Sequence, residues 1–131
     1  MSKREYIQAN KEWLNRKSKE EGVKPLPKGI CYKVLAEGNP QSATPGPRSI
    51  VTARYSGRTI DGKQFDCSGG TPLACRLSDL IDGWIIALQR MHVGDKWEIY
   101  IPSEMGYGKF SQPGIPAGST LVFEIELVGI A

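Results

Sequence analysis

Downstream of residue 25 the chain consists of short β-prone runs separated by glycine and proline clusters, and this pattern restricts the fold more than any other feature. Two of the runs lie at residues 30–36 and 49–55. The prolines of residues 40–47 between them disfavour both a helix and a central strand. The pair Asp61-Gly62 predicts a tight turn before the next run. The sequence therefore predicts a small sheet built from consecutive short strands.

The last two runs alternate between apolar and polar side chains. In residues 96–101 the apolar positions are Trp97, Ile99 and Ile101, and residues 121–127 repeat the pattern. Successive side chains of a strand point to opposite faces of the sheet. The alternation therefore predicts a sheet with one buried face and one solvated face.

The segment 78–91 is typical of a loop that enters one short helix. Trp84, Leu88 and Met91 follow the i, i+4, i+7 spacing of a helical face, and residues 93–95 end the pattern. This is the only internal helix long enough to cover a sheet. We therefore expect an α+β fold in which an antiparallel sheet folds over this helix.

An N-terminal helix precedes the β-rich part. Ser2 and Glu5 have the spacing of a capping box, and the helix is expected to end before Gly22. One stripe of this helix is apolar and consists of Tyr6, Ile7, Trp13 and Leu14. The stripe fits two alternatives, packing on the domain or forming a dimerisation or tethering surface. We expect a helical extension over residues 1–24 and one domain over residues 25–131.

Composition excludes several classes of protein. A chain of 131 residues with 40% hydrophobic and 24% charged residues has the size and content of one folded domain. The net charge of +3 is small, and its charges are interleaved, which argues against nucleic-acid binding. No apolar run has the length of a membrane span or of a signal-peptide core. We expect a soluble cytoplasmic protein, or a periplasmic one if a signal peptide was removed.

Residues for metal, disulfide or hydrolytic chemistry are sparse. Cys31, Cys67 and Cys75 form an odd set without CxxC spacing, which argues against a disulfide framework and a zinc site. No nucleophile elbow, zinc-helix motif or phosphate-binding loop occurs. The single histidine, His92, is expected to be a solvent-facing turn residue. The sequence predicts no metal and no cofactor.

Several motifs occur in a fixed order along residues 51–124. The stretch VTARYSGRTIDGKQFDCS is followed by Leu80-Ile81-Asp82-Gly83-Trp84, Met91-His92-Val93-Gly94, Ile101-Pro102, Tyr107-Gly108, Pro113-Gly114-Ile115-Pro116 and Thr120-Leu121-Val122-Phe123-Glu124. Taken together they resemble the FKBP-type peptidyl-prolyl cis-trans isomerase family over about residues 25–131. The N-terminal helix resembles the extension of the bacterial branch. The resemblance implies a half-barrel sheet of five to six strands around the short helix.

The resemblance also implies a prolyl pocket. Trp84 would form its floor, Tyr107 would donate a hydrogen bond to a substrate carbonyl, and the Ile81 N–H would bond another. Asp66 would lie near the twisting carbonyl and orient Tyr55, so the catalytic set is Asp66, Tyr107 and Tyr55. The substrate-binding set implied by the resemblance is Phe65, Leu73, Cys75, Leu80, Ile81, Trp84, Ile115 and Phe123.

One wall of this pocket departs from the family pattern. Where aromatic residues are common, residues 72–77 read PLACRL, so Leu73 and Cys75 replace aromatic area. The implied function is isomerisation of X-Pro bonds in unfolded or partly folded proteins, with an altered preference for the residue before proline. We expect weak binding of macrolide inhibitors. The alternative is a proline-directed binding or chaperone module with incidental turnover, and a homodimer through the N-terminal helix is a further expectation.

Overall fold

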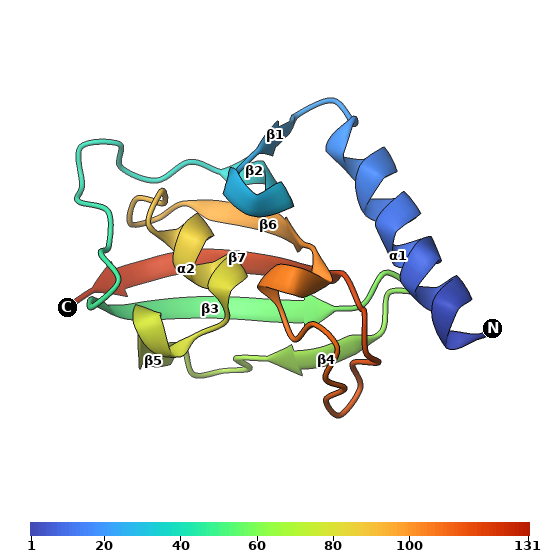
Figure 1. Cartoon of the computed structure of the whole chain (residues 1–131). Helices are drawn as coiled ribbons and strands as arrows, with labels where there is room; N and C mark the ends of the chain where they lie inside the picture. The colour runs from blue at the N-terminus through green and yellow to red at the C-terminus, as the bar shows by residue number, and fades with distance from the viewer.

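A long N-terminal helix and a seven-stranded antiparallel sheet form the structure, a computed structural model that describes residues 1–131 (Figure 1). A second, shorter helix lies against one face of the sheet (Figure 1). The elements are α1 (Lys3–Ser18), β1 (Val23–Pro25), β2 (Cys31–Ala36), β3 (Ile50–Arg58), β4 (Gln64–Cys67), β5 (Leu73–Arg76), α2 (Asp82–Leu88), β6 (Lys96–Ile101) and β7 (Leu121–Ile130). The predicted α+β class is confirmed.

The strand order is β1-β2-β6-β7-β3-β4, with β5 also paired to β3. The long strand β3 pairs with β4 through Ser56–Arg58 and with β5 through Ile50–Ala53. The sheet has seven strands, more than the five or six expected, because β1 and β5 are three and four residues long. Runs this short contain too few positions for alternation to reveal a strand.

The main core lies between α2 and the sheet. Trp84, Leu88 and Met91 are buried there, as their spacing predicts. The helix nevertheless ends at Leu88, before Met91. The Met91 N–H bonds back three residues to the Leu88 carbonyl, and the Asp95 carboxylate accepts the His92 N–H at 2.8 Å. These bonds tighten the chain into a turn that stops the helix before the predicted end.

The α1 helix begins at the predicted capping box. The Ser2 Oγ accepts the Glu5 N–H at 3.1 Å, and the Glu5 carboxylate accepts the Ser2 N–H at 3.2 Å. The helix docks on the segment directly before β7, where the Tyr6 hydroxyl lies 2.7 Å from the Ser119 Oγ and the Asn10 Oδ1 accepts the Thr120 N–H at 2.8 Å. Trp13 and Leu14 pack against a cluster of Cys31, Tyr100 and Val122, so the apolar stripe packs on the chain itself, the first of the two alternatives.

The docking of α1 buries part of the sheet face that was expected to be solvated. Trp97, Ile99 and Ile101 face α2, whereas Tyr100 points to the opposite side. Tyr100 is only 1% exposed, because the Trp13 ring lies edge-on at 5.9 Å. The prediction of one solvated face is wrong at this end of the sheet, where α1 covers it.

Strand β1 lies across the predicted boundary at residue 25. Its residues pair with β2, with Val23 opposite Lys33 and Pro25 opposite Cys31. The division into residues 1–24 and 25–131 stays a prediction.

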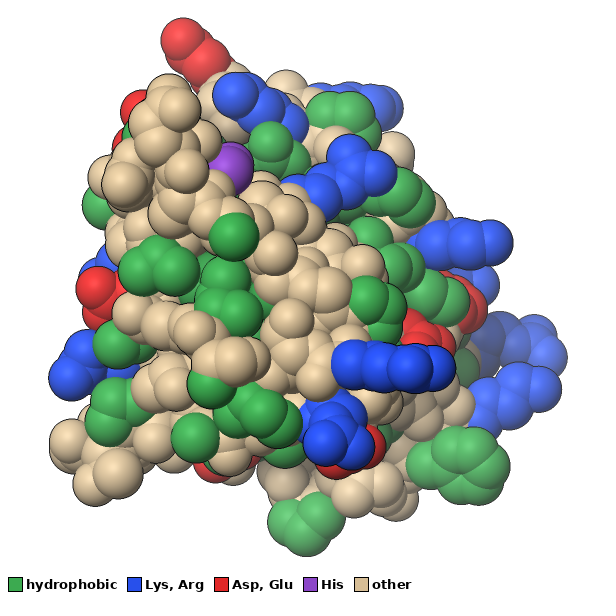
Figure 2. Space-filling model, turned by 90° about the vertical axis from the view of Figure 1, so that its left-hand side faces the viewer, with side chains coloured by type: hydrophobic (Ala, Val, Ile, Leu, Met, Phe, Trp, Pro, Cys, Tyr) green, Lys and Arg blue, Asp and Glu red, His purple; other side chains and the backbone are tan.

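None of the helices combines the length and apolar character needed to cross a membrane. Figure 2 views the end of the molecule opposite α1, where the C-terminus lies in Figure 1. Hydrophobic side chains are scattered over this end, and Lys and Arg side chains gather toward one edge (Figure 2). This end presents no continuous apolar face.

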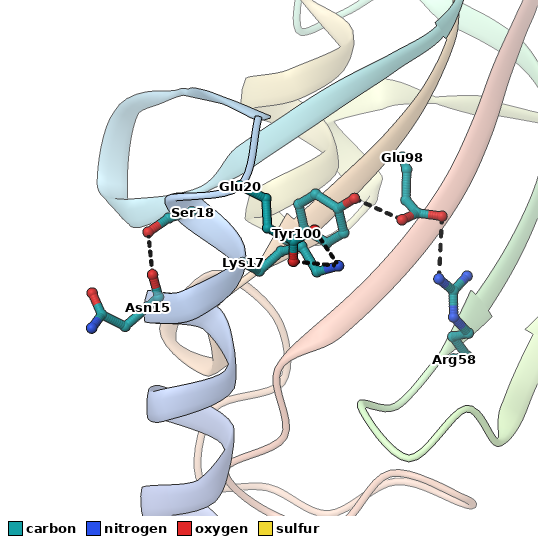
Figure 3. Close-up of polar contacts among 7 residues, drawn as sticks. All are labelled: Asn15, Lys17, Ser18, Glu20, Arg58, Glu98 and Tyr100. Carbon is teal, nitrogen blue, oxygen red and sulfur yellow. Dashed lines mark hydrogen bonds and ion pairs between the residues drawn. The ribbon is translucent and has the colours of Figure 1, made fainter. Parts of the chain in front are cut away.

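A polar network lies beside α1, on the side of the sheet that α1 covers (Figure 3). The Tyr100 hydroxyl donates to Glu98 at 2.6 Å, and the Arg58 guanidinium donates to the other carboxylate oxygen at 3.2 Å. Lys17 of α1 pairs with Glu20 at 3.0 Å and lies over the Tyr100 ring. Burial raises the pKa of Glu98, but the bonds from Tyr100 and Arg58 outweigh it and the net pKa is lowered.

This network predicts a pH dependence of stability. A carboxyl whose folded pKa lies below its unfolded value of about 4.3 stabilises the fold above that pH, and the contribution is lost as the pH falls through the folded pKa. Glu98→Gln should lower the free energy of unfolding by about 1 kcal/mol at pH 7, since the network is partly exposed. The difference from the unsubstituted protein should shrink toward pH 3, measured by urea unfolding.

Glu124→Gln is the matched control, because Glu124 lies opposite Glu98 on β7 and pairs with Lys96 at 2.8 Å, but its side chain is more exposed, at 36% against 20% for Glu98. An exposed pair of this kind contributes little. Equal losses for Glu98→Gln and Glu124→Gln at pH 7 would contradict the prediction.

Candidate functional site

A mostly apolar pocket of about 160 Å³ opens between α2, the sheet and the segment that follows β6. Seven of its nine lining residues are hydrophobic. The lining residues are Tyr55, Asp66, Leu73, Asp79, Leu80, Ile81, Trp84, Tyr107 and Phe123. They come from β3, β4, β5, α2, β7 and two connecting segments, one between β5 and α2 and one between β6 and β7, so the pocket exists only in the folded chain.

Aromatic rings form the base of the pocket. Trp84 is 4% exposed. Its ring packs edge to face on Tyr55 and on Phe123, with centroid distances of 5.1 Å and 5.4 Å. The Phe65 ring also packs edge to face against the Phe123 ring, with a centroid distance of 5.5 Å. Gly57 of β3 permits this packing, since a Cβ there would lie 2.6 Å from the Phe123 ring and 2.7 Å from the Phe65 ring. The rings hold each other in a fixed, water-poor arrangement.

Asp66 and Tyr55 form a fixed polar pair at the pocket. The Tyr55 hydroxyl donates to the Asp66 Oδ2 at 2.8 Å, and the Oδ1 accepts the Cys67 N–H at 2.8 Å. Burial and the bond to Asp66 raise the pKa of Tyr55 to about 12. Tyr55 therefore stays protonated at neutral pH and holds the exposed carboxylate in one orientation.

Two hydrogen-bond donors of the pocket have no partner within the protein. The Tyr107 hydroxyl lies in the wall and makes no hydrogen bond. The Ile81 N–H precedes the first turn of α2 and likewise has no acceptor, although the Ile81 carbonyl accepts from Trp84 at 3.0 Å. A peptide bound in the pocket can supply carbonyl oxygens to both donors.

The structure brings together eight of the predicted site residues and leaves three outside the lining. Phe65 lies behind Phe123, Cys75 lies further along β5 than Leu73, and Ile115 is 4% exposed in the core. Reciprocal backbone bonds between Gln112 and Ile115 close a tight loop that directs Ile115 inward.

Sequence reasoning missed Asp79 and misjudged His92. Asp79 lines the pocket directly before Leu80, and only its position beside that residue could have indicated it. His92 is half-buried, and its Nδ1 lies 2.7 Å from the Ser42 carbonyl oxygen. It ties the turn after α2 to the loop that follows β2. All three cysteines are free, and no three His, Cys, Asp or Glu side chains are grouped to hold a metal ion.

Comparison with known proteins decides the family. A family model described as FKBP-type peptidyl-prolyl cis-trans isomerase matches residues 41–128. The chain belongs to this family. The FKBP match contains all nine lining residues of the pocket, from Tyr55 to Phe123.

Curated FKBP-type relatives match most of this chain. FkpA of Escherichia coli K12 is 41% identical over 122 residues, which is 92% of this chain and 44% of FkpA. The 22 kDa FKBP-type isomerase of the same strain is 40% identical over 122 residues, 91% of this chain and 58% of that protein. The peptidyl-prolyl isomerase Mip of Coxiella burnetii is 39% identical over 124 residues, 92% of this chain and 53% of Mip. The chain spans about half the length of these relatives.

Solved structures agree with the FKBP fold. The crystal structure of a peptidyl-prolyl cis-trans isomerase from Pseudomonas syringae superposes with a TM-score of 0.93 at 36% identity, covering 100% of this chain and 97% of that one. The crystal structure of E. coli FkpA gives a TM-score of 0.90 at 39% identity, covering 97% of this chain and 60% of that one. Both superpositions include the N-terminal helix α1, since they cover nearly the whole chain.

Proposed function

We propose that this FKBP-family chain catalyses cis/trans rotation about X-Pro peptide bonds in polypeptide clients. The observation that carries the proposal is an apolar, aromatic pocket with two unpartnered donors, the Tyr107 hydroxyl and the Ile81 N–H. The family match and the names of the relatives support the same reaction.

The pocket is suited to a prolyl ring. The ring has three methylene groups, and burying each contributes about 0.8 kcal/mol. Trp84 would contact the ring at the floor, with Leu80 and Phe123 at the sides. The substrate chain would then be fixed on both sides of the bond by the Tyr107 hydroxyl and the Ile81 N–H.

Rotation needs no covalent intermediate. The barrier of about 18–20 kcal/mol arises from amide resonance, which the twisted state lacks. A water-poor pocket disfavours the charge-separated resonance form of the planar amide, and hydrogen bonds that fit the twisted conformer lower the barrier further. A reduction of about 7 kcal/mol would accelerate rotation about 10⁵-fold. Asp66, held by Tyr55, would face the twisting carbonyl.

A proline-limited refolding assay and a proline tetrapeptide assay test the proposal. Catalysis should appear at micromolar protein or below in both. Rates equal to the uncatalysed reaction at that concentration would reject it.

The pocket wall carries a prediction on inhibitors. Of the two residues that replace aromatic ones, only Leu73 lines the pocket, and macrolide inhibitors should bind weakly for lack of an aromatic contact. Leu73→Phe should raise macrolide affinity about 2- to 10-fold, because burying about 20–50 Å² of additional apolar surface contributes about 0.5–1.3 kcal/mol. Titration calorimetry measures it. Cys75→Phe is the control, expected to change affinity less, and equal gains would contradict the assignment of Leu73 to this wall.

Two further proposals concern the oligomeric state of the protein and its location in the cell. The apolar stripe of α1 packs on this chain, through contacts such as Trp13 on Tyr100, which favours a monomer over a homodimer through α1. Sedimentation equilibrium decides between the two.

One relative, 36% identical over 121 residues, is named outer membrane protein MIP of Legionella longbeachae. That name supports an envelope location over the cytoplasm, and fractionation of the native cells tests it.

A further inference from the structure

A second cleft lies on the other side of the turn that carries Tyr107. It has a volume of about 420 Å³ and separates α1 from the segment between β6 and β7. Its lining residues are Lys3, Ile7, Lys11, Ser103, Glu104, Gly108, Lys109, Ala117 and Gly118. None of these residues lines the prolyl pocket.

The cleft is basic. Lys3 and Lys11 flank Ile7 at i, i+4 and i+8 on one face of α1, and Lys109 faces them from the opposite wall. The protein has five ion pairs, and none involves these three lysines. Glu104 is the single carboxylate of the lining and is also unpaired. Unpaired lysine ammonium groups around one cleft favour an anionic ligand.

The walls of the cleft are held in place without a ligand. The Ile7 side chain packs so closely on Gly118 that a Cβ at this glycine would lie 2.4 Å from it, and Gly118 has a φ of +81°. The Gly118 N–H donates to the Gly108 carbonyl at 2.9 Å, which closes the opposite wall. Asn10 anchors the helix by accepting the Thr120 N–H at 2.8 Å. The backbone that carries the three lysines is therefore held in place before a ligand binds.

The cleft and the prolyl pocket share one turn of backbone. Tyr107 lines the pocket, and the next two residues, Gly108 and Lys109, line the cleft. An extended polypeptide advances about 3.3–3.6 Å per residue, so a chain with its proline in the pocket reaches past this turn within a few residues.

We propose that this cleft binds acidic side chains of the client polypeptide, located a few residues from the proline that is isomerised. The inference rests on the proposed function and adds a substrate class to it. The contacts form in the ground state and the transition state alike, so they lower KM and leave kcat unchanged. Screening by salt should remove the effect, because the lysines are at the surface.

The test compares proline peptides that differ only in their flanks. One peptide carries glutamates three to six residues from the proline, on either side, and its partner carries glutamines there. The cleft variant is Lys3→Gln, Lys11→Gln, Lys109→Gln. The control variant is Lys24→Gln, Lys28→Gln, Lys33→Gln, which removes the same charge at exposed lysines outside the cleft.

The unsubstituted protein and the control variant should show a KM about fivefold lower for an acidic peptide than for its neutral partner. The cleft variant should show no difference, while all three proteins should turn over the neutral peptide equally. An absent preference in the unsubstituted protein, or an equal loss in the control variant, would overturn the proposal. Peptide binding by calorimetry gives the same comparison without turnover, so a failure of the isomerase assay is distinguished from a failure of this inference.

Discussion

Replacing Trp84 with alanine is expected to abolish measurable isomerase activity and to lower the free energy of unfolding by about 3–5 kcal/mol. Trp84 is 4% exposed and belongs both to the core and to the pocket floor. The substitution removes the surface that would contact the prolyl ring and leaves a cavity beneath Tyr55 and Phe123. Urea unfolding and the tetrapeptide assay measure the two effects.

A loss this large is a substantial part of the 5–15 kcal/mol that stabilises a typical domain. Activity must therefore be measured where circular dichroism shows the variant to be folded, and Trp84→Leu provides a milder apolar floor. Trp97→Ala is the matched control, because Trp97 is 6% exposed, stacks on Tyr32 at 4.0 Å and lies outside the pocket. Full activity in folded Trp84→Ala, or equal loss of activity per folded molecule in Trp97→Ala, would contradict the role of Trp84.

The double variant Asp66→Ala, Tyr107→Phe should lose activity about 100-fold while remaining folded. Each change removes one polar interaction with the substrate, and 1.36 kcal/mol per interaction corresponds to about tenfold in rate. Asp66 is exposed, and the Tyr107 hydroxyl has no partner in the protein. Stability should fall by only about 1 kcal/mol, because the Tyr55 hydroxyl loses its acceptor. The measurements are kcat/KM on a proline peptide and urea unfolding.

Two single variants serve as controls for this pair. Tyr32→Phe removes a hydroxyl outside the pocket and should leave activity unchanged, whereas Asp79→Ala removes the other carboxylate of the lining. A loss of activity in Asp79→Ala as large as that in the double variant would mean that catalysis responds to negative charge at the pocket in general. The double variant also separates enzyme from chaperone, since suppression of client aggregation should survive if the pocket mainly holds clients. Unchanged kcat/KM in the double variant would refute the assigned roles.

Much of the fold was predictable because its signals are local. The capping box of Ser2 and Glu5 involves neighbouring residues, and the alternation of residues 96–101 reports the two faces of one strand. The end of α2 at Leu88 was not predictable from the spacing of Trp84 and Met91. That end depends on Asp95, whose carboxylate also accepts the Gly38 N–H at 2.7 Å from a distant loop.

Prediction of the site depended on resemblance more than on periodicity. Ordered motifs pointed to Trp84, Tyr107 and Asp66, which the structure places around one pocket. Ile115 lies in a matching motif as well, yet the closed loop from Gln112 directs it into the core. A motif identifies the residue types of a site, whereas the direction of each side chain depends on the backbone that carries it.

The sequence by itself determined the short strands after residue 25, the buried positions of the alternating strands and membership of the FKBP family. These properties depend on residue order and on the period of a strand or helix. Only the tertiary structure decided that α1 covers Tyr100, and that Lys3 and Lys11 lie opposite Lys109. The physical reason is that a local period shows which face of an element is apolar, whereas the element that covers this face is chosen by contacts between residues far apart in the chain.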